Sequence, residues 1–401
     1  MATVDSSRGT VDSSRGAGSW LTAADCRLDE FIELVETPSS LADYPHAVGV
    51  EQNVVVYDAS SLTGLVGEAR RSVQAELADV FLNGPGIAVF KQAFSDHGVI
   101  DAASGVFWTI IDEQRASGAA AGDHFATPGA NDRIWNALEK LALRNPAAFV
   151  DYYANDIIAL ASAAWLGPGY QVTAQVNCVN PGGAAQSPHR DYHLGFMTID
   201  RAMEYPTHVH GLSPTMTLQG AVAHCDMPIE TGPTQYLPHS QKYGPGYLAW
   251  WQPEFKAYFE SHHVQLPLVK GDVVFFNPAL FHAAGENRTS DVRRLGNLLQ
   301  VGSAFGRSIE TVDREAVVNA IYPALAAVAP SLPVWAVANV VAAGAEGYAF
   351  PTDLDRDQPV GGLTPPSMND IVTDAVAAGS SAEELAAELR ALATRRRTFF
   401  G

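Results

Sequence analysis

The segment Ser187-Pro-His-Arg-Asp-Tyr-His193 carries two side chains that are able to bind a metal ion. On an extended backbone, residues two apart face the same way, so His189 and Asp191 project together while Arg190 points away. One imidazole and one carboxylate supply two adjacent ligands to a divalent metal. A three-residue pattern is common by chance, and a surface histidine beside an aspartate is usually just solvated. The pair therefore needs a third ligand before it predicts a metal site.

His282 is the candidate for that third ligand. It ends the segment 270–282, in which a Gly-Asp turn leads into an apolar run, and this pattern places an imidazole at a β-core position. With His189 and Asp191 it would complete a facial triad that leaves positions open for oxygen and substrate. The same ligand types also suit zinc, so a hydrolase with this site stays open. A β-barrel binding protein without activity is the third reading.

An arginine follows His282 at the start of another predicted strand. Arg293 lies eleven residues after His282, and the strand continues through Leu295 and Leu299. A guanidinium there could hold a carboxylate by a bidentate pair. Arg294 faces the opposite side of this strand, so only one of the two should point inward.

The elements that must position these residues form three blocks. Up to about residue 165 the apolar spacing is mainly helical, and it is interrupted by a turn and a short strand at 87–90. From residue 170, short β-rich runs punctuated by Gly and Pro suggest an antiparallel sandwich or barrel. Helical spacing then returns, with a capping box at Ser381 and Glu384. The predicted helices cover 60–82, 99–114, 132–165, 310–329 and 382–392, and the predicted strands of the core cover 171–179, 215–224, 234–237, 264–268, 272–276 and 294–301.

Composition restricts the class of protein. The 401 residues are 47% hydrophobic and carry a net charge of −19, from 44 acidic and 25 basic side chains. Such a surface repels nucleic acid and anionic lipid, and no apolar run is long enough to span a membrane. Three unpaired cysteines and the lack of a secretory signal favour a soluble, cytoplasmic protein. The repeated heptad T-V-D-S-S-R-G at 3–9 and 10–16 is read as a flexible tail.

Taken together, four motifs resemble the phytanoyl-CoA dioxygenase (PhyH) family of Fe(II)- and 2-oxoglutarate-dependent oxygenases. They occur in the family's order between about residues 84 and 305. The motifs are G-P-G-I-A-V-F at 84–90, H-R-D at 189–191, E-T-G-P-T-Q-Y-L-P-H-S at 230–240, and F-N-P at 276–278 with His282 and Arg293. The third departs from the family's Gly-Ser-His ending, because His239 here precedes Ser240 and Gln241.

The resemblance implies an α+β fold with a double-stranded β-helix (jelly-roll, cupin-like) core flanked by N-terminal and C-terminal helices. It implies that His189, Asp191 and His282 hold Fe(II) and form the catalytic centre, with 2-oxoglutarate and O2 as co-substrates. Arg293 would pair with the C5 carboxylate of 2-oxoglutarate. Other cofactor-binding positions correspond more loosely, and a structural amide is an equally good reading for each of them: Gln175, Asn177 and Gln219.

The expected activity is hydroxylation of an unactivated C–H bond in a small molecule, such as an amino-acid derivative or a natural-product intermediate. Related halogenases replace the metal carboxylate, which is present here as Asp191, so hydroxylation is favoured over halogenation. Only five lysines and a net charge of −19 argue against a coenzyme A ester. Aromatic side chains could line the pocket, although each taken singly is expected in the core: Trp108, Phe125, Trp135, Tyr192, His193 and Phe196.

The predicted organisation is a flexible tail at 1–20, an oxygenase domain at 21–305 with its β-core at about 170–305, and a C-terminal helical extension at 306–401 packed on the core. The sequence does not indicate an oligomeric state.

Overall fold

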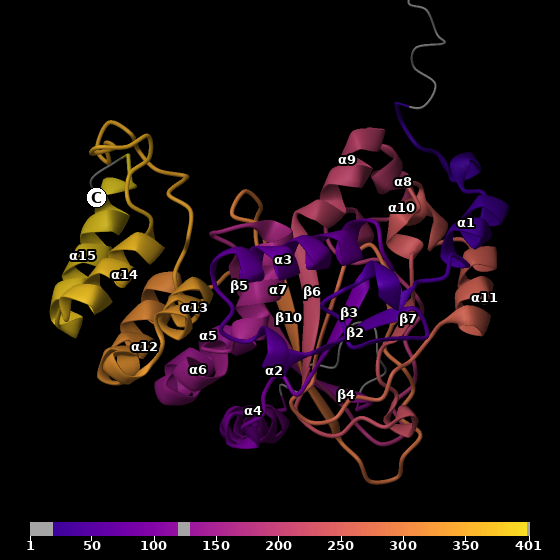
Figure 1. The fold of residues 1–401 in the computed structure, drawn as a ribbon, viewed down its shortest axis with the longest axis horizontal. Coiled ribbons are helices and arrows are strands. Elements are labelled where there is room, and N and C mark those ends of the chain that lie inside the picture. Colours follow the sequence, from indigo (N-terminus) through magenta and orange to yellow (C-terminus); the bar gives the residue numbers. More distant parts are fainter. Residues whose placement is uncertain (1–18, 119–128, 399–401) are drawn as a thin grey trace, which may run out of the picture.

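The computed structural model describes residues 19–118 and 129–398 of the chain (Figure 1). The repeated heptad, Phe125 and all of the predicted tail except Ser19 and Trp20 lie outside the described residues. Trp20 forms a β-bridge with Pro206, and its indole N–H donates to the carbonyl of Glu204 at 3.3 Å. The last residue of the predicted tail thus contacts the body of the protein.

A large sheet forms the centre of the molecule. Among the described residues it has eight strands, in the spatial order β1-β2-β3-β8-β6-β10-β5-β4, and every pairing is antiparallel except that of β2 with β3. The strands are β1 Gly49–Glu51, β2 Val54–Asp58, β3 Ile87–Lys91, β4 Asn131–Ile134, β5 Gln171–Val179, β6 Thr217–Ala223, β8 Val273–Phe276 and β10 Arg294–Gly302.

A smaller sheet pairs β7 (Gln235–Leu237) with β9 (Phe281–Ala283). Isolated bridges widen it on both sides, His189 to His282 and Tyr236 to Val264. The predicted jelly-roll core with flanking helices is confirmed. The predicted strand at 264–268 is wrong, because only Val264 and Leu268 form bridges there.

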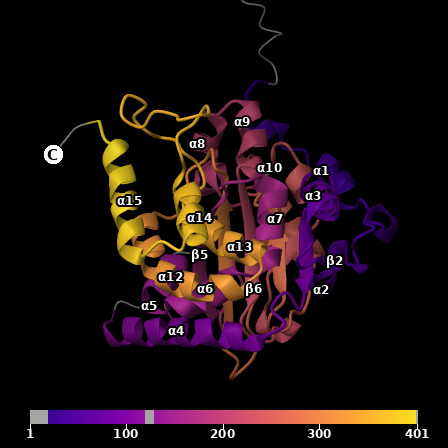
Figure 2. The ribbon, with the colours of Figure 1, turned by 60° about the vertical axis from the view of Figure 1, so that its left-hand side comes forward.

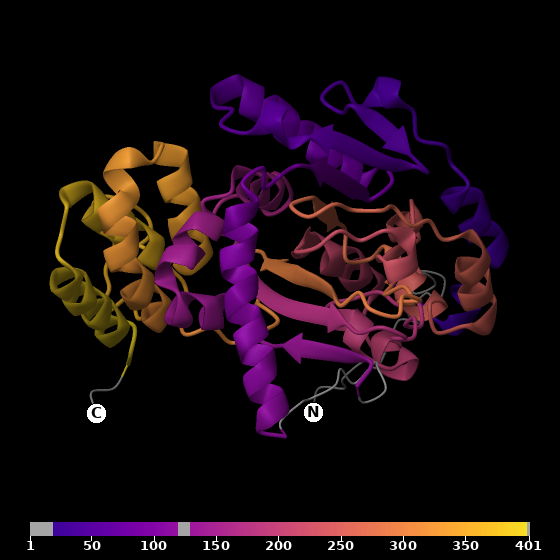
Figure 3. The same cartoon turned by 90° about the horizontal axis from the view of Figure 1, so that it is seen from below.

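Helices cover the outer face of the large sheet. Figure 2 shows the C-terminal helices in front of β5 and β6, and Figure 3 shows the long α4 running beside the sheet. The helices before the core are α1 Leu28–Val35, α2 Ala59–Leu62, α3 Gly67–Leu82, α4 His97–Ala116, α5 Ala137–Arg144, α6 Pro146–Tyr153 and α7 Asp156–Leu166. None of the helices within the described ranges combines the length and apolar character needed to cross a membrane.

Short helices connect the core strands, and longer ones follow them. Within the core lie α8 Ile199–Met203, α9 Thr207–Leu212, α10 Gly246–Ala249 and α11 Pro253–His262. After it come α12 Arg314–Val328, α13 Val334–Gly344, α14 Met368–Ala378 and α15 Ala382–Arg395. Seven 3-10 turns are described: Ala23–Asp25, Leu41–Asp43, His193–Phe196, Ser213–Thr215, Ile229–Thr231, Ser240–Lys242 and Ala329–Ser331.

The C-terminal helices begin where capping side chains allow. The predicted capping box of α15 is confirmed, since Ser381 accepts from the Glu384 amide and Glu384 accepts from the Ser381 amide. Helix α12 starts at Arg314 rather than at 310, because the Asp313 side chain accepts from the Ala316 amide. Residues 303–313 are therefore a connection between β10 and α12.

The two faces of the central strands have different environments. On β10, Leu295, Leu299 and Val301 pack with the helices in the main apolar core. The alternate residues Gly296 and Leu298 face the space between the two sheets. This alternation follows from the period of two in a strand, and it decides which side chains can reach a ligand between the sheets.

Gly232 occupies a position in the 230–240 turn that only glycine fits. Its φ is +70°, and an added Cβ would lie 2.3 Å from the backbone oxygen of Glu286. We expect Gly232→Ala to lower the free energy of unfolding by about 2–5 kcal/mol, combining roughly 1–2 for the left-handed backbone and roughly 1–3 for the steric overlap. Urea unfolding of the purified variant measures this loss.

Gly182 provides the matched control, because its φ is +77° but nothing lies within 4 Å of an added Cβ. Gly182→Ala should cost only the backbone contribution, about 1–2 kcal/mol. If Gly232→Ala and Gly182→Ala lowered the free energy of unfolding equally, the steric explanation for Gly232 would be wrong.

Candidate active site

Two strand-like segments bring the three predicted metal ligands together. After β5 the chain crosses to the smaller sheet, where the amides of His189 and His282 each donate to the other residue's carbonyl, at 3.0 and 3.2 Å. The Asp191 amide donates to the carbonyl of Pro278 at 3.1 Å. This extended pairing keeps alternate side chains on one side, so His189 and Asp191 face the same space as His282.

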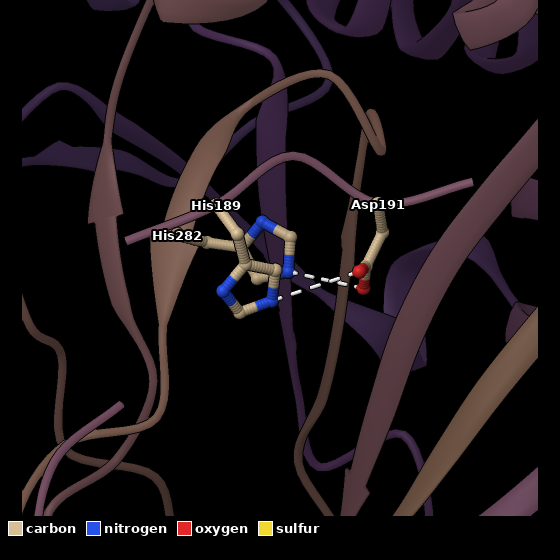
Figure 4. Close-up of side chains that lie close together, drawn as sticks. All are labelled: His189, Asp191 and His282. Atoms are coloured by element: carbon tan, nitrogen blue, oxygen red, sulfur yellow. Dashed lines mark ion pairs between the residues drawn. The ribbon is translucent and has the colours of Figure 1, made fainter. Parts of the chain in front are cut away.

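The donor atoms of these residues converge (Figure 4). The Nε2 atom of His189 lies 3.6 Å from Oδ1 of Asp191, and that of His282 lies 3.4 Å from Oδ2. All three donor atoms lie within 4.8 Å of one another. Two imidazoles and one carboxylate at this spacing could hold a divalent metal ion.

Hydrogen bonds to the backbone fix the orientation of both imidazoles. Nδ1 of His189 lies 2.9 Å from the Ser187 carbonyl, and Nδ1 of His282 lies 2.8 Å from the Leu280 carbonyl. Since a carbonyl only accepts, Nδ1 carries a proton in each ring, and Nε2 is the nitrogen that faces the space where a metal could bind. Burial acts to raise the pKa of Asp191, but the two histidines outweigh it and hold that pKa below its ordinary value. Asp191 is thus an ionised ligand.

Arg190 points away from this site, as predicted. Its guanidinium donates to the carbonyls of Ser240 and Tyr243, at 2.6 and 3.0 Å, and lies over the rings of Tyr247 and Phe281. Burial lowers the pKa of Arg190 to about 10. The residue between the two ligands therefore anchors the metal segment to the protein interior.

The 230–240 turn supports the second histidine strand. Ser240 donates to the Leu237 carbonyl at 2.6 Å and accepts from the Phe281 amide at 2.8 Å, which links β7 to β9. His239 instead contacts Ser39 at 3.0 Å and Lys242 at 2.8 Å. Burial and the Lys242 charge lower the pKa of His239 to about 4. The departure from the family motif thus leaves the turn intact and directs this histidine away from the metal ligands.

A cavity of about 370 Å³ lies between the sheets and contains the three ligands, a volume within the range of roughly 300–1,000 Å³ that small-molecule sites occupy. Gln175, Asn177 and Gln219 also line it. The side toward β3 and β8 is apolar, with Ile87, Val89, Val274, Phe276, Leu266 and Leu268.

The predicted inward orientation of Arg293 is wrong. Its guanidinium lies 4.2 Å from the centre of the Trp108 ring and 3.5 Å from Asp132, outside the cavity lining. Arg294 is the residue that lines the cavity, on the same face as Gly296 and Leu298. The residues that share a face with Arg293 pack against the helices, and this packing decides the orientation.

Arg294 is a buried cation. It is 7% exposed and donates to the carbonyl of Gly232, and burial lowers the pKa of its guanidinium to about 10. Within the described part of the chain it forms no ion pair with a carboxylate. A buried cation without a counter-charge is unfavourable, so this arginine is suited to an anionic ligand in the cavity.

Three apolar side chains from distant parts of the sequence lie at the cavity and remain partly exposed. They are Trp135 before α5, Phe196 after the metal motif, and Ile309 in the 303–313 connection. The exposed fractions of Phe196 and Ile309 are 53% and 37%. Of the other aromatic candidates, Trp108 contacts Arg293 instead. Ile309 was not predicted, because no sequence pattern indicates that a connection folds back over a cavity.

A buried carboxyl group holds that connection in place. Oε1 of Glu310 accepts from the Asn136 amide at 2.7 Å, which ties residues 303–313 to the start of α5 beside Trp135. Burial raises the pKa of Glu310 to about 7. The carboxyl group is therefore protonated in the folded protein at pH values where it is ionised in the unfolded chain.

Glu310→Gln should remove a pH dependence of stability. Because the folded-state pKa is raised, the contribution of Glu310 is fully present below about pH 4.5 and is lost as pH rises to about 7. The parent should lose up to about 3 kcal/mol relative to the variant over this window. Urea unfolding at pH 5 and pH 8 measures the difference, with exposed Glu388→Gln as control. If the free energies of unfolding of the parent and of Glu310→Gln changed equally with pH, Glu310 would not be the source of this pH dependence.

One family model matches more than half of the chain. The family model described as phytanoyl-CoA dioxygenase (PhyH) matches residues 55–295. No curated protein sequence matches the chain.

Among solved structures, the chain is similar to the non-heme alpha ketoglutarate dependent epimerase SnoN from nogalamycin biosynthesis, with 19% identity and a TM-score of 0.42 over 58% of this chain and 82% of that one. It is similar to the carbocyclase SnoK of the same biosynthesis, with 17% identity and a TM-score of 0.38 over 62% and 86%. It is also similar to AviO1 from Streptomyces viridochromogenes Tue57, with 18% identity and a TM-score of 0.42 over 58% of this chain and 96% of that one.

Proposed function

Because the chain belongs to the phytanoyl-CoA dioxygenase (PhyH) family, we propose that it is an Fe(II)- and 2-oxoglutarate-dependent oxygenase that hydroxylates an unactivated C–H bond of a small molecule. The observation that carries this proposal is the placement of Arg294 in the same cavity as His189, Asp191 and His282. A metal site and a buried cation for an anionic ligand are the two features that this chemistry requires.

His189, Asp191 and His282 would hold the iron. Their donor set, two imidazole Nε2 atoms and one ionised carboxylate, suits Fe(II) and leaves other coordination positions for ligands. Bound iron would supply the activation of O2 that is coupled to decarboxylation of 2-oxoglutarate. The hydrogen bonds from Nδ1 to the carbonyls of Ser187 and Leu280 keep both rings directed at the metal position.

Arg294 would bind the C5 carboxylate of 2-oxoglutarate. A guanidinium matches a carboxylate bidentately, and a pair of opposite charges is strong where water is excluded. The apolar wall that includes Leu266, Leu268 and Val274 suits the methylene groups between the two acid groups.

The substrate would bind at the partly exposed apolar group formed by Trp135, Phe196 and Ile309. Next to this group the cavity presents amides at Gln175, Asn177 and Gln186, which donate and accept hydrogen bonds. A neutral or zwitterionic compound with an apolar ring or chain fits both features, such as an amino-acid derivative or a natural-product intermediate. A surface with a net charge of −19 is unfavourable for a coenzyme A ester.

The test is turnover by the purified chain with Fe(II), ascorbate, O2 and 2-oxoglutarate, screened against a collection of metabolites. We expect succinate formation that Fe(II) supports and Zn(II) does not, and a product that has gained the mass of one oxygen atom. Hydrolysis with Zn(II) and without 2-oxoglutarate would favour a metal-dependent hydrolase. Binding of metabolites without any turnover would favour a non-catalytic binding protein.

A further inference from the structure

Gln219 is the polar residue on the cavity face of β6, where Ala221 and Ala223 are its small neighbours. Its Nε2 donates to Oδ2 of Asp191 at 2.5 Å, and the side chain is 4% exposed. A hydrogen bond from an amide to an ionised carboxylate is among the stronger kinds in proteins. Gln219 therefore contacts a proposed metal ligand directly.

A second glutamine fixes the orientation of this amide. Gln300 on β10 lies opposite Gln219 in the strand register, and its Oε1 accepts from Nε2 of Gln219 at 3.5 Å. The same Oε1 accepts from the hydroxyl of Tyr192, the residue after Asp191. Both N–H groups of Gln219 thus point at acceptors, one on Asp191 and one on Gln300.

The other end of the Gln219 amide is left without a partner. Within the described residues, its Oε1 is buried and accepts no hydrogen bond. An unsatisfied buried acceptor costs about 1–3 kcal/mol. Turning the amide over would not remove this cost, because Oε1 would then face the Asp191 carboxylate, which only accepts. The orientation of the Gln219 amide is therefore set by its hydrogen bond to Asp191, and it does not serve to stabilise β6.

We propose that Gln219 is a positioning residue for the metal carboxylate: it holds Oδ2 of Asp191, so that the carboxylate presents Oδ1 to the metal. This inference rests on the proposed function. A carboxylate that is free to rotate can bind a metal through both oxygens and so occupy an additional coordination position. Gln219 keeps that position available for the co-substrates. Its amide thus acts on the metal through Asp191 rather than as a contact for 2-oxoglutarate.

The test measures Co(II) binding by visible absorption, which reports both affinity and ligand geometry without turnover. Gln219→Met keeps the length of the side chain and removes the donor. We expect Co(II) to bind about 10–100-fold more weakly, as for other residues that orient metal ligands, and the Co(II) spectrum to change. Gln219→Glu keeps the shape but replaces the donor with an acceptor, so its Co(II) spectrum should change as well.

Gln171→Met is the matched control. Gln171 lies on β5, and its Nε2 donates to the carbonyls of Ser303 and Gly306, at 2.9 and 3.1 Å, away from the cavity. Its Co(II) affinity should stay within about twofold of the parent, the usual result for independent sites. Thermal unfolding of the metal-free proteins shows whether each variant is folded.

Parent-like affinity and an unchanged spectrum in folded Gln219→Met and Gln219→Glu would overturn the positioning role and leave the proposed function standing. If the parent itself shows no Co(II) spectrum that Asp191→Ala removes, the metal site of the proposed function fails, and the role of Gln219 fails with it.

Discussion

Replacing Asp191 with alanine is expected to lower 2-oxoglutarate-dependent succinate formation at least about 100-fold, since even residues that only orient metal ligands contribute about 10–100-fold. Asp191 is the sole anionic member of the three-residue donor group, and its depressed pKa keeps it ionised. Its loss leaves two imidazoles and no anionic ligand, a set that binds Fe(II) weakly. Succinate measured by chromatography at saturating Fe(II) and 2-oxoglutarate checks this.

Asp291→Ala serves as the control for this substitution. Asp291 is an exposed carboxylate in the loop between β9 and β10, so its loss should leave succinate formation unchanged. Thermal unfolding of Asp191→Ala separates a lost metal site from a lost fold. Substantial turnover by a folded Asp191→Ala protein would remove Asp191 from the metal site.

The second large effect concerns two neighbouring arginines. Arg294→Leu should raise the KM for 2-oxoglutarate by roughly 30- to 5,000-fold, because truncating one partner of a buried charge pair costs about 2–5 kcal/mol. The unliganded Arg294→Leu protein should be at least as stable as the parent, since leucine replaces a buried cation that has no counter-charge among the described residues. Initial rates at varied 2-oxoglutarate, together with thermal unfolding, measure both quantities.

Arg293→Leu is the matched control, one residue away in the sequence and outside the cavity. It removes a contact with the Trp108 ring and an ion pair with Asp132, which are worth about 1 kcal/mol at a half-exposed site. The variant should therefore lose a little stability and keep its KM for 2-oxoglutarate. If Arg293→Leu raised the KM and Arg294→Leu did not, the co-substrate role would return to Arg293.

Which of Arg293 and Arg294 points into the cavity does not follow from the sequence of the strand alone. A period of two correctly separates Arg293 from Arg294, but it does not say which face is inward. Leu295 and Leu299 on one face and Leu298 on the other are all apolar, so hydrophobicity does not choose between them. The helices on the outer face of the large sheet make the choice, and they come from parts of the sequence both before and after the core strands.

The convergence of His189, Asp191 and His282 was easier to predict because its geometry is local. His189 and Asp191 share an extended segment, and His282 ends a run of β-forming residues, so the fold had only to pair two short strands. The short strands β1, β2 and β4 were missed, since three to five residues carry little periodicity. The contact of Glu310 with Asn136 joins residues 174 positions apart, and no local pattern reveals it.

The 303–313 connection forms part of the cavity wall although it lies beyond the matched family region, residues 55–295. Ile309 forms part of the cavity wall, and Glu310 fastens that wall to α5. In the proposed function, Ile309 is thus a residue that meets the substrate from outside the family region, whereas the proposed metal ligands lie within it. Under this proposal, a substitution in the 303–313 connection changes which compound is accepted without touching His189, Asp191 or His282.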